Sequence, residues 1–285
     1  MQRKQFIKAS AFGLIAMQLQ DFTRQFSQEE DTRMPALFVG HGNPMNAIED
    51  NEFSRGWAAQ GQLLPTPKAI LCVSAHWLTK GTRVAAIDKP ETIHDFGGFP
   101  QSLFDVQYPA PGAPDLAKTT SELITSTKVE LDHEWGLDHG CWSVLNKMYP
   151  AANIPVYQLS IDYYQTPEYH YALAAQLKAL RKRGVLIMGS GNIVHNLRLF
   201  TWTDTAFDWA VEFDTKIKGF IEKGDHQSVI KYKDLGQSAL LSVPTNDHYL
   251  PLLYTLGVME STETIRFFNE KTTAGSISMR SFVTA

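Results

Sequence analysis

Four short apolar segments, each rich in β-forming residues and each followed closely by a histidine, constrain the fold of this chain most. The segments and the histidines after them are 36–40 with His41, 69–75 with His76, 185–188 with His195 and 240–243 with His248. Runs of this length and composition are typical of buried strands. Helical patterns lie between several of them, so the sequence predicts an α/β fold with a mostly parallel central sheet flanked by helices.

The placement of these histidines predicts a shared site. The strands of a parallel sheet end at one edge, and ligands bind in the crevice outside their carboxyl ends. Four imidazoles would therefore converge there. Because neutral imidazole is a common metal ligand, the sequence predicts a metal centre at the C-terminal ends of the strands.

The composition is that of one globular domain and excludes several classes of function. The chain has 285 residues, of which 44% are hydrophobic and 20% charged, and it contains no repetitive or linker-like tract. Its net charge of −4 and its lack of a basic run argue against nucleic acid as a partner. Two cysteines make no disulfide framework. No stretch approaches the roughly 20 apolar residues of a spanning helix, so we expect no stable membrane insertion.

Residues 1–33 are expected to form an N-terminal extension with two alternative interpretations. Arg3 and Lys4 precede a short apolar run at 9–17, a pattern that resembles a degenerate twin-arginine export signal. The run ends early at Gln18, and no small-residue cleavage site follows. We therefore favour a surface helix and a cytoplasmic location, with export as the alternative.

Further elements are expected from periodicity and turn residues. The expected helices are 115–126, 169–182 and 208–223. The expected additional strands are 82–87, 155–161, 265–268 and 276–283. The stretch 91–114 is rich in glycine, proline and aromatic residues and has no clear period, which is typical of a functional loop.

Two apparent motifs do not meet the requirements of their classes. The segment from His133 to His139 resembles a zinc-protease helix, but the second histidine of that motif would fall at Leu137. The Gly-Ser-Gly at 189–191 lacks both the Lys-Ser/Thr of a phosphate-binding loop and the last glycine of a dinucleotide fingerprint. Ser190 is also not in a Gly-x-Ser-x-Gly elbow, so a serine or cysteine hydrolase has little support.

The remaining histidines differ in their surroundings. His94 lies in the segment 92–100, whose two glycines and two phenylalanines suit a lid that faces a substrate. His139 follows Asp138 in a Gly-Leu-Asp-His-Gly context that indicates a turn. Polar or helical surroundings predict surface positions for the last three, His133, His170 and His226.

Seven motifs occur in a characteristic order. They are GHGNPM at 40–45, SAHW at 74–77, HDFGGFP at 94–100, YPAPG at 108–112, GLDHG at 136–140, GNIVHNL at 191–197 and HYLPL at 248–252. With these motifs the chain resembles the class III extradiol ring-cleavage dioxygenases, and most closely the 4,5-DOPA dioxygenase extradiol group. The resemblance begins at about Met34, so 34–285 is the expected catalytic domain.

The resemblance implies a non-haem metal centre held by His41, His76 and His248, with His195 at or beside it. It implies Fe(II) for activity. An all-histidine site also suits zinc, which we expect to occupy the site in isolated protein. His195 and His139 match positions that act as acid/base residues in the class.

The implied reaction is the ring cleavage of a DOPA-like catechol by O₂, with both oxygen atoms entering the product. The expected partners are therefore a small-molecule catechol and O₂, and His94 would contact the substrate. A zinc-binding protein of the same fold, with hydrolytic or structural use of the metal, is the alternative from another functional class.

Overall fold

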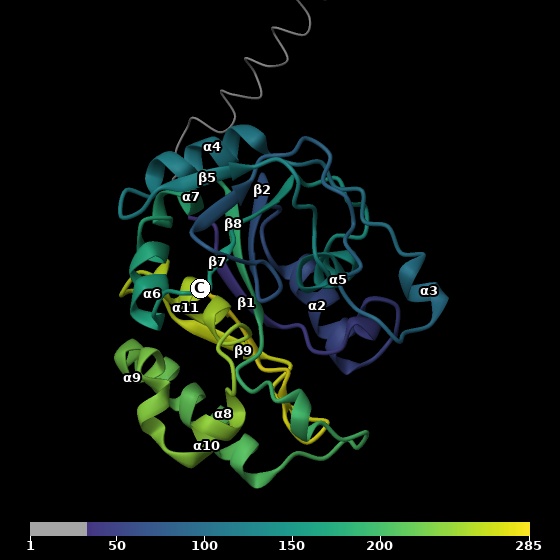
Figure 1. Ribbon diagram of the computed structural model, residues 1–285, viewed down its shortest axis with the longest axis vertical. Helices are drawn as coiled ribbons and strands as arrows, with labels where there is room; N and C mark the ends of the chain where they lie inside the picture. Colours follow the sequence, from purple (N-terminus) through teal and green to yellow (C-terminus); the bar gives the residue numbers. More distant parts are fainter. Residues whose placement is uncertain (1–32) are drawn as a thin grey trace, which may run out of the picture.

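A six-stranded sheet forms the centre of the computed structural model, which describes residues 33–285 (Figure 1). Its strands, in spatial order, are β6 (Val156–Gln158), β2 (Ala69–Ser74), β8 (Val185–Gly191), β1 (Ala36–Gly40), β12 (Ser281–Thr284) and β9 (Ile265–Phe268). The first four are parallel to one another, β12 is antiparallel to its neighbours β1 and β9, and β9 therefore runs in the same direction as the first four. The mostly parallel sheet expected from the sequence is confirmed. The expected N-terminal extension, apart from residue 33, lies outside the described residues.

The central strands are buried on both faces, and their alternate residues enter two separate hydrophobic cores. In β2, Leu71 and Val73 pack into one core, and Ile70 and Cys72 pack into the other. This alternation follows from the pleat of a strand, which directs successive side chains to opposite faces. A strand covered on both faces reads as a continuous apolar run, which is why the sequence revealed these strands.

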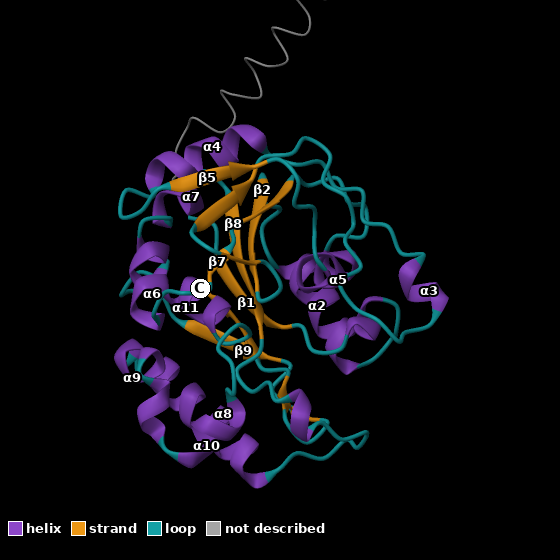
Figure 2. Cartoon of the chain, viewed as in Figure 1, coloured by secondary structure: helices purple, strands orange, loops and turns teal. Residues whose placement is uncertain are grey.

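Helices cover both faces of the sheet (Figure 2). On one face α6 (Pro167–Ala175) packs with α11 (Leu250–Gly257), and on the other α2 (Glu52–Leu63) packs with α5 (His139–Met148). The other helices are η1 (Pro44–Ala47), α3 (Gln101–Phe104), α4 (Pro114–Leu123), α7 (Lys178–Lys182), η2 (Leu197–Leu199), α8 (Asp208–Glu222), α9 (His226–Ile230), η3 (Tyr232–Leu235) and α10 (Gln237–Ser242). In residues 33–285 no helix is long and apolar enough to cross a membrane.

Three small two-stranded sheets flank the central one. They pair β4 (Thr82–Ala85) with β5 (Val129–Asp132), β3 (Leu78–Thr79) with β7 (Ile161–Asp162), and β10 (Thr272–Thr273) with β11 (Ile277–Ser278). The strand expected at 82–87 therefore forms as β4, outside the central sheet. The strand expected at 155–161 is divided into β6 and β7, and the helix expected at 169–182 is divided into α6 and α7.

The apolar segment before His248 is helical, so the prediction of a strand at 240–243 was wrong. The segment belongs to α10, which begins after Gly236, at φ 89°, and packs on α8. Its burial is one-sided, since Ala239 is buried and Leu240 is 55% exposed. The periodicity of so short an apolar run does not distinguish a strand from a helix, and here packing on α8 decides.

Two helices that apolar periodicity did not reveal, α2 and α5, begin at side-chain caps. Asn51 accepts a hydrogen bond from the backbone N–H of Ser54, and Asp138 accepts one from that of Cys141. Such caps satisfy N–H groups that have no partner in the first helical turn. His139 is therefore the first residue of α5 and does not lie in the expected turn.

Candidate metal centre

The aligned ends of β1, β2 and β8 bring three histidines to one edge of the sheet. The register pairs Gly40, the last residue of β1, with Gly191, the last residue of β8, and β2 ends one position earlier. His41, His76 and His195 follow these three strands and line the same cavity. The strand order β2-β8-β1 thus produces the convergence that the sequence predicted for these three.

His248 reaches the same edge from another element, because it lies just before α11. Its carbonyl accepts a hydrogen bond from the backbone N–H of Asn192 at 2.8 Å. This carbonyl occupies the space that a side chain at position 191 would need, so Gly191 permits the close approach. The backbone N–H of His195 donates to the carbonyl of Ser242 at 2.9 Å, which ties the segment after β8 to α10.

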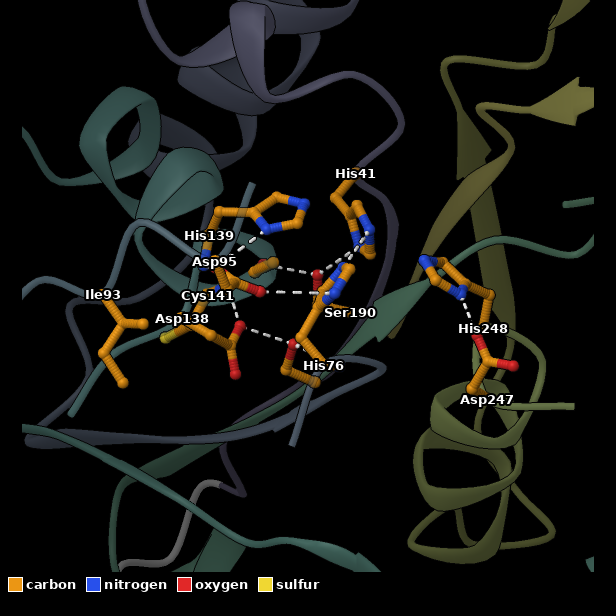
Figure 3. Close-up of polar contacts among 12 residues, drawn as sticks. His41, His76, Ile93, Asp95, Asp138, His139, Cys141, Ser190, Asp247 and His248 are labelled. Atoms are coloured by element: carbon orange, nitrogen blue, oxygen red, sulfur yellow. Dashed lines mark hydrogen bonds and ion pairs between the residues drawn. The ribbon is translucent and has the colours of Figure 1, made fainter. Parts of the chain in front are cut away.

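Three imidazole rings form a triangle at this edge (Figure 3). The ring centroids of His41 and His76 lie 5.0 Å apart, those of His41 and His248 5.3 Å, and those of His76 and His248 5.0 Å. Metal–nitrogen bonds of about 2.1 Å place imidazole centroids about 5 Å apart around one tetrahedral ion. The triangle therefore has about the size of a three-histidine metal site. The ligand atoms that all lie within 4.8 Å of one another are those of His41, His76 and His139 and, separately, those of His195, Asp247 and His248.

Carboxylates orient two of these rings through Nδ1. The Nδ1 atom of His76 lies 3.4 Å from Oδ2 of Asp95, and that of His248 contacts Oδ2 of Asp247. A carboxylate accepts hydrogen bonds and does not donate them, so His248 carries a proton on Nδ1, and a proton on Nδ1 of His76 would face an acceptor. Their Nε2 lone pairs are then free for a ligand.

Ser190 places His41 in the same tautomer. Its hydroxyl donates to the carbonyl of Gly140 at 2.5 Å and therefore accepts from Nδ1 of His41, which lies 3.0 Å away. The Nε2 atoms of His41 and His76 lie 3.1 Å apart, so in these tautomers two lone pairs face each other. A cation between them would remove this repulsion, and the donor set fits Fe(II) or Zn(II).

Burial favours the neutral form of His41, His76 and His195. It lowers the pKa values of His41 and His76 well below their usual range, and the neighbouring histidines lower them further. Burial also lowers the pKa of His195 to about 2, with a further contribution from His248. A neutral ring keeps the lone pair that a metal or a proton requires.

Two further histidines lie beside the triangle. The ring of His195 stacks on that of His248. The ring centroid of His139 lies 3.9 Å from that of His76, and its Nδ1 atom lies 3.0 Å from Oδ1 of Asp95. Both line the cavity, so they are placed to exchange protons with a bound molecule.

A largely apolar cavity of about 660 Å³ opens onto these histidines. The aromatic side chains that line it are Phe53, Phe96, Phe99, Phe200 and Trp202. Its carboxylates are Asp95 and Asp204, and no lysine or arginine is among the described residues of its lining. An apolar cavity with a few convergent polar groups is typical of a site for a small aromatic molecule.

His94 does not line this cavity, contrary to the expectation that it faces the substrate. Its ring packs against Phe96 and Trp142, and its Nε2 atom lies 3.0 Å from the carbonyl oxygen of Val106. The next two residues, Asp95 and Phe96, line the cavity, whereas His94 packs outside its lining. The loop predicted at 91–114 does reach the cavity, but through Asp95 and Phe96.

The oxygen-bearing partners of the histidines were missed in the sequence. They are Asp95, Ser190 and Asp247. Asp247 adjoins His248 in the chain, and this adjacency was a usable signal. Asp95 adjoins His94 but contacts His76 and His139, so its partners depend on the folded loop.

Asp138 is buried next to the site, between the end of β2 and the start of α5. Its carboxylate accepts hydrogen bonds from the Ser74 hydroxyl at 2.6 Å and from the Gln158 amide at 2.7 Å, and it caps α5. Burial, together with the charge of Asp95, raises the pKa of Asp138. Asp138 thus joins the end of β2, which precedes His76, to the helix that begins at His139.

Comparison with known proteins identifies the family. A model described as the catalytic LigB subunit of aromatic ring-opening dioxygenase matches residues 38–280, so the chain belongs to this family. The chain is 48% identical over 256 residues to the 4,5-DOPA dioxygenase extradiol of Escherichia coli (strain K12), and this alignment covers 88% of this chain and 94% of that protein. It is 37% identical over 235 residues to the protein of the same name from Beta vulgaris, and that alignment covers 80% of this chain and 88% of the relative.

A solved structure has the same fold. The crystal structure of an uncharacterized protein from Escherichia coli K12 matches with a TM-score of 0.77 at 43% identity, and the match covers 88% of this chain and 99% of that chain. The resemblance that the seven motifs indicated is therefore confirmed at the level of the family and the fold.

Proposed function

We propose that this protein is a non-haem, metal-dependent extradiol dioxygenase that opens the aromatic ring of a catechol with O₂. The observation that carries the proposal is the triangle of His41, His76 and His248 at an apolar cavity, with His139 and His195 beside it. Membership of the family of aromatic ring-opening dioxygenases supports the class of reaction.

In this proposal the Nε2 atoms of His41, His76 and His248 hold the metal. Bound Fe(II) supplies the Lewis acidity that favours a deprotonated catechol and the redox chemistry that activates O₂. The chain binds and orients the substrate. The aromatic walls of the cavity hold a planar ring, and their apolar surface excludes water.

His139 and His195 move the protons of the reaction. The two hydroxyl groups of a catechol release protons, and a neutral imidazole is a suitable acceptor. Since Nδ1 of His139 faces Asp95, the acceptor atom of His139 is Nε2. In the overall reaction a ring carbon–carbon bond beside the two hydroxyl-bearing carbons breaks. Both atoms of O₂ enter the product, a yellow muconic semialdehyde.

Metal loading and O₂ uptake test the proposal. Protein purified without oxygen is loaded separately with Fe(II) and Zn(II), and each form is given L-DOPA and a panel of other catechols. The Fe(II) form should consume one O₂ for each catechol and produce a yellow, pH-sensitive chromophore. The Zn(II) form should consume none, because zinc has no redox chemistry.

Two outcomes would contradict the proposal. One is the absence of O₂ uptake across the panel with Fe(II) confirmed bound. The other is hydrolytic activity in the Zn(II) form alone, which would support a zinc-dependent use of the same all-nitrogen ligand set.

A further inference from the structure

Asp95 contacts two histidines of the site with one carboxylate (Figure 3). Its Oδ1 atom lies 3.0 Å from Nδ1 of His139 and accepts a hydrogen bond from the backbone N–H of His139 at 2.9 Å. Its Oδ2 atom lies 3.4 Å from Nδ1 of His76. The side chain is 20% exposed and forms part of the cavity wall. It therefore joins the segment after β2 to the first residue of α5.

A carboxylate can only accept, so it determines which nitrogen of each ring carries the proton. Oxygens of Asp95 face Nδ1 of His76 and Nδ1 of His139, so a proton on Nδ1 of either ring would meet an acceptor. Their Nε2 atoms then keep a lone pair. His76 needs that lone pair to bind a metal ion, and His139 needs it to accept a proton from a substrate.

We propose that Asp95 is a positioning residue that sets the Nδ1-protonated tautomer of His76 and His139 together. One carboxylate thereby prepares a metal ligand and an acid/base residue at the same time. The roles of the two histidines rest on the proposed function, whereas their tautomers do not. Carboxylates that orient metal-ligating histidines in this way typically contribute about 10- to 100-fold to metal affinity.

The competing explanation is that Asp95 only anchors its loop. Its Oδ1 atom bonds the backbone N–H of His139 at the N-terminus of α5, a favourable position for a negative charge. Removal of the whole side chain would disturb both this anchor and the tautomers. A variant that keeps the anchor and alters the tautomer is therefore required.

The substitution Asp95→Asn separates the two roles, because an amide has the size of a carboxylate. Its oxygen can replace Oδ1, accept from the backbone N–H of His139 as before, and face Nδ1 of the His139 ring. Its NH₂ group then replaces Oδ2 and presents a donor to Nδ1 of His76. His76 must carry its proton on Nε2 to accept this bond, and the metal loses that lone pair.

NMR spectra of protein labelled with ¹⁵N at histidine, with metal removed by a chelator, report the tautomer of each ring. In the wild type, we expect the Nδ1–H form for His76 and His139. In Asp95→Asn we expect His76 to change to the Nε2–H form and His139 to keep its tautomer. Competition titration should show zinc affinity lower by about 10- to 100-fold in this variant.

Two further variants serve as controls. Asp95→Glu retains the carboxylate and should restore the wild-type tautomers. Asp105→Asn makes the same change at an exposed carboxylate of the same loop, which bonds Gln101 and no histidine, and should leave tautomers and zinc affinity unchanged.

The proposal is overturned by an Nε2–H form of His76 or His139 in the wild type. It is also overturned by an unchanged His76 tautomer together with unchanged zinc affinity in Asp95→Asn. If that variant does not fold, the wild-type spectrum still decides. Neither measurement involves O₂, so a failure of the dioxygenase proposal would be seen separately.

Discussion

The ring of His195 lies face to face on the ring of His248, with centroids 3.5 Å apart and planes 4° apart. The lone pair of an imidazole nitrogen lies in the plane of its ring, so two stacked parallel rings do not direct their lone pairs at one ion. His248 completes the triangle with His41 and His76. We therefore propose His248 as a ligand and His195 as an acid/base residue.

Replacement of single histidines tests this division. His41→Ala, His76→Ala and His248→Ala each remove a proposed ligand. Loss of a residue that hydrogen-bonds a metal ligand typically lowers metal affinity by about 10- to 100-fold, so loss of the ligand itself should lower it further. His195→Ala should retain metal. Metal content by mass spectrometry, with circular dichroism to confirm folding, measures the effect, and the exposed His133→Ala is the control. Normal binding in all three ligand variants would place the site elsewhere, and loss of metal in His195→Ala would make His195 a ligand.

His139→Gln should lower kcat by about 10²-fold or more, the usual effect of a lost acid/base residue. Metal content and KM should stay near the wild-type values, because His139 is not part of the triangle. Steady-state O₂ uptake provides both kinetic constants. His94→Gln is a matched control, since His94 packs on Phe96 as His139 does but lies outside the cavity lining. Unchanged turnover in His139→Gln would reduce this residue to a structural role.

The charges of the cavity predict a preference among catechols. The described lining contains the carboxylates Asp95 and Asp204 and neither lysine nor arginine. A catechol with an amine side chain, such as dopamine, should therefore have a higher kcat/KM than 3,4-dihydroxyphenylacetate, by about 10-fold or about 1.4 kcal/mol. Asp204→Asn should reduce the difference in kcat/KM between the two catechols, because it removes a negative charge from the lining and leaves Lys271 nearby. Equal kcat/KM values for both substrates would show that the cavity does not sense this charge.

His170 predicts a loss of stability in acid. This residue is fully buried, its Nδ1 atom lies 2.9 Å from the Tyr254 hydroxyl, and burial lowers its pKa to about 4, against an opposing effect of Asp162. The unfolded state, with a pKa of about 6.5, binds the proton first as the pH falls. The stabilisation is therefore present above pH 6.5 and is lost as the pH falls towards 4, with a loss of about 2 kcal/mol between pH 7 and pH 5.

Denaturant unfolding of the wild type and His170→Gln at pH 7 and pH 5 measures this effect. The free energy of unfolding of the wild type should fall by about 2 kcal/mol more than that of the variant. Both proteins share the histidines of the metal centre, so the difference between them isolates His170. Equal losses in the two proteins would show that His170 is protonated equally in the folded and unfolded states.

The sequence predicted the parts of the site that depend on local pattern. The buried strands appear as apolar runs, and the order β2-β8-β1 follows the expected parallel arrangement, so His41, His76 and His195 were placed correctly at strand ends. The parts that depend on long-range packing were not predictable. The run before His248 is a helix because it packs on α8, and His170 is buried because α6 packs against α11.

The carboxylate that contacts His76 and His139 was also not predictable from the sequence, although it lies within a motif. The glycines and phenylalanines of 92–100 predicted that His94 would face the substrate, yet its neighbour Asp95 is the residue that faces the histidines. The path of the loop over the edge of the sheet determines which of two adjacent side chains points inward. The local sequence pattern does not predict this path.

The position of β1 between β8 and β12 has a consequence for synthesis of the protein. β1 leaves the ribosome first among the strands of the described chain, but its two neighbours in the sheet come much later, and β12 comes last. His41 and His248 therefore meet only after most of the sequence has been translated. If His41, His76 and His248 hold the metal as proposed, a nascent chain does not bring them together, and we expect metal to bind only a nearly complete polypeptide.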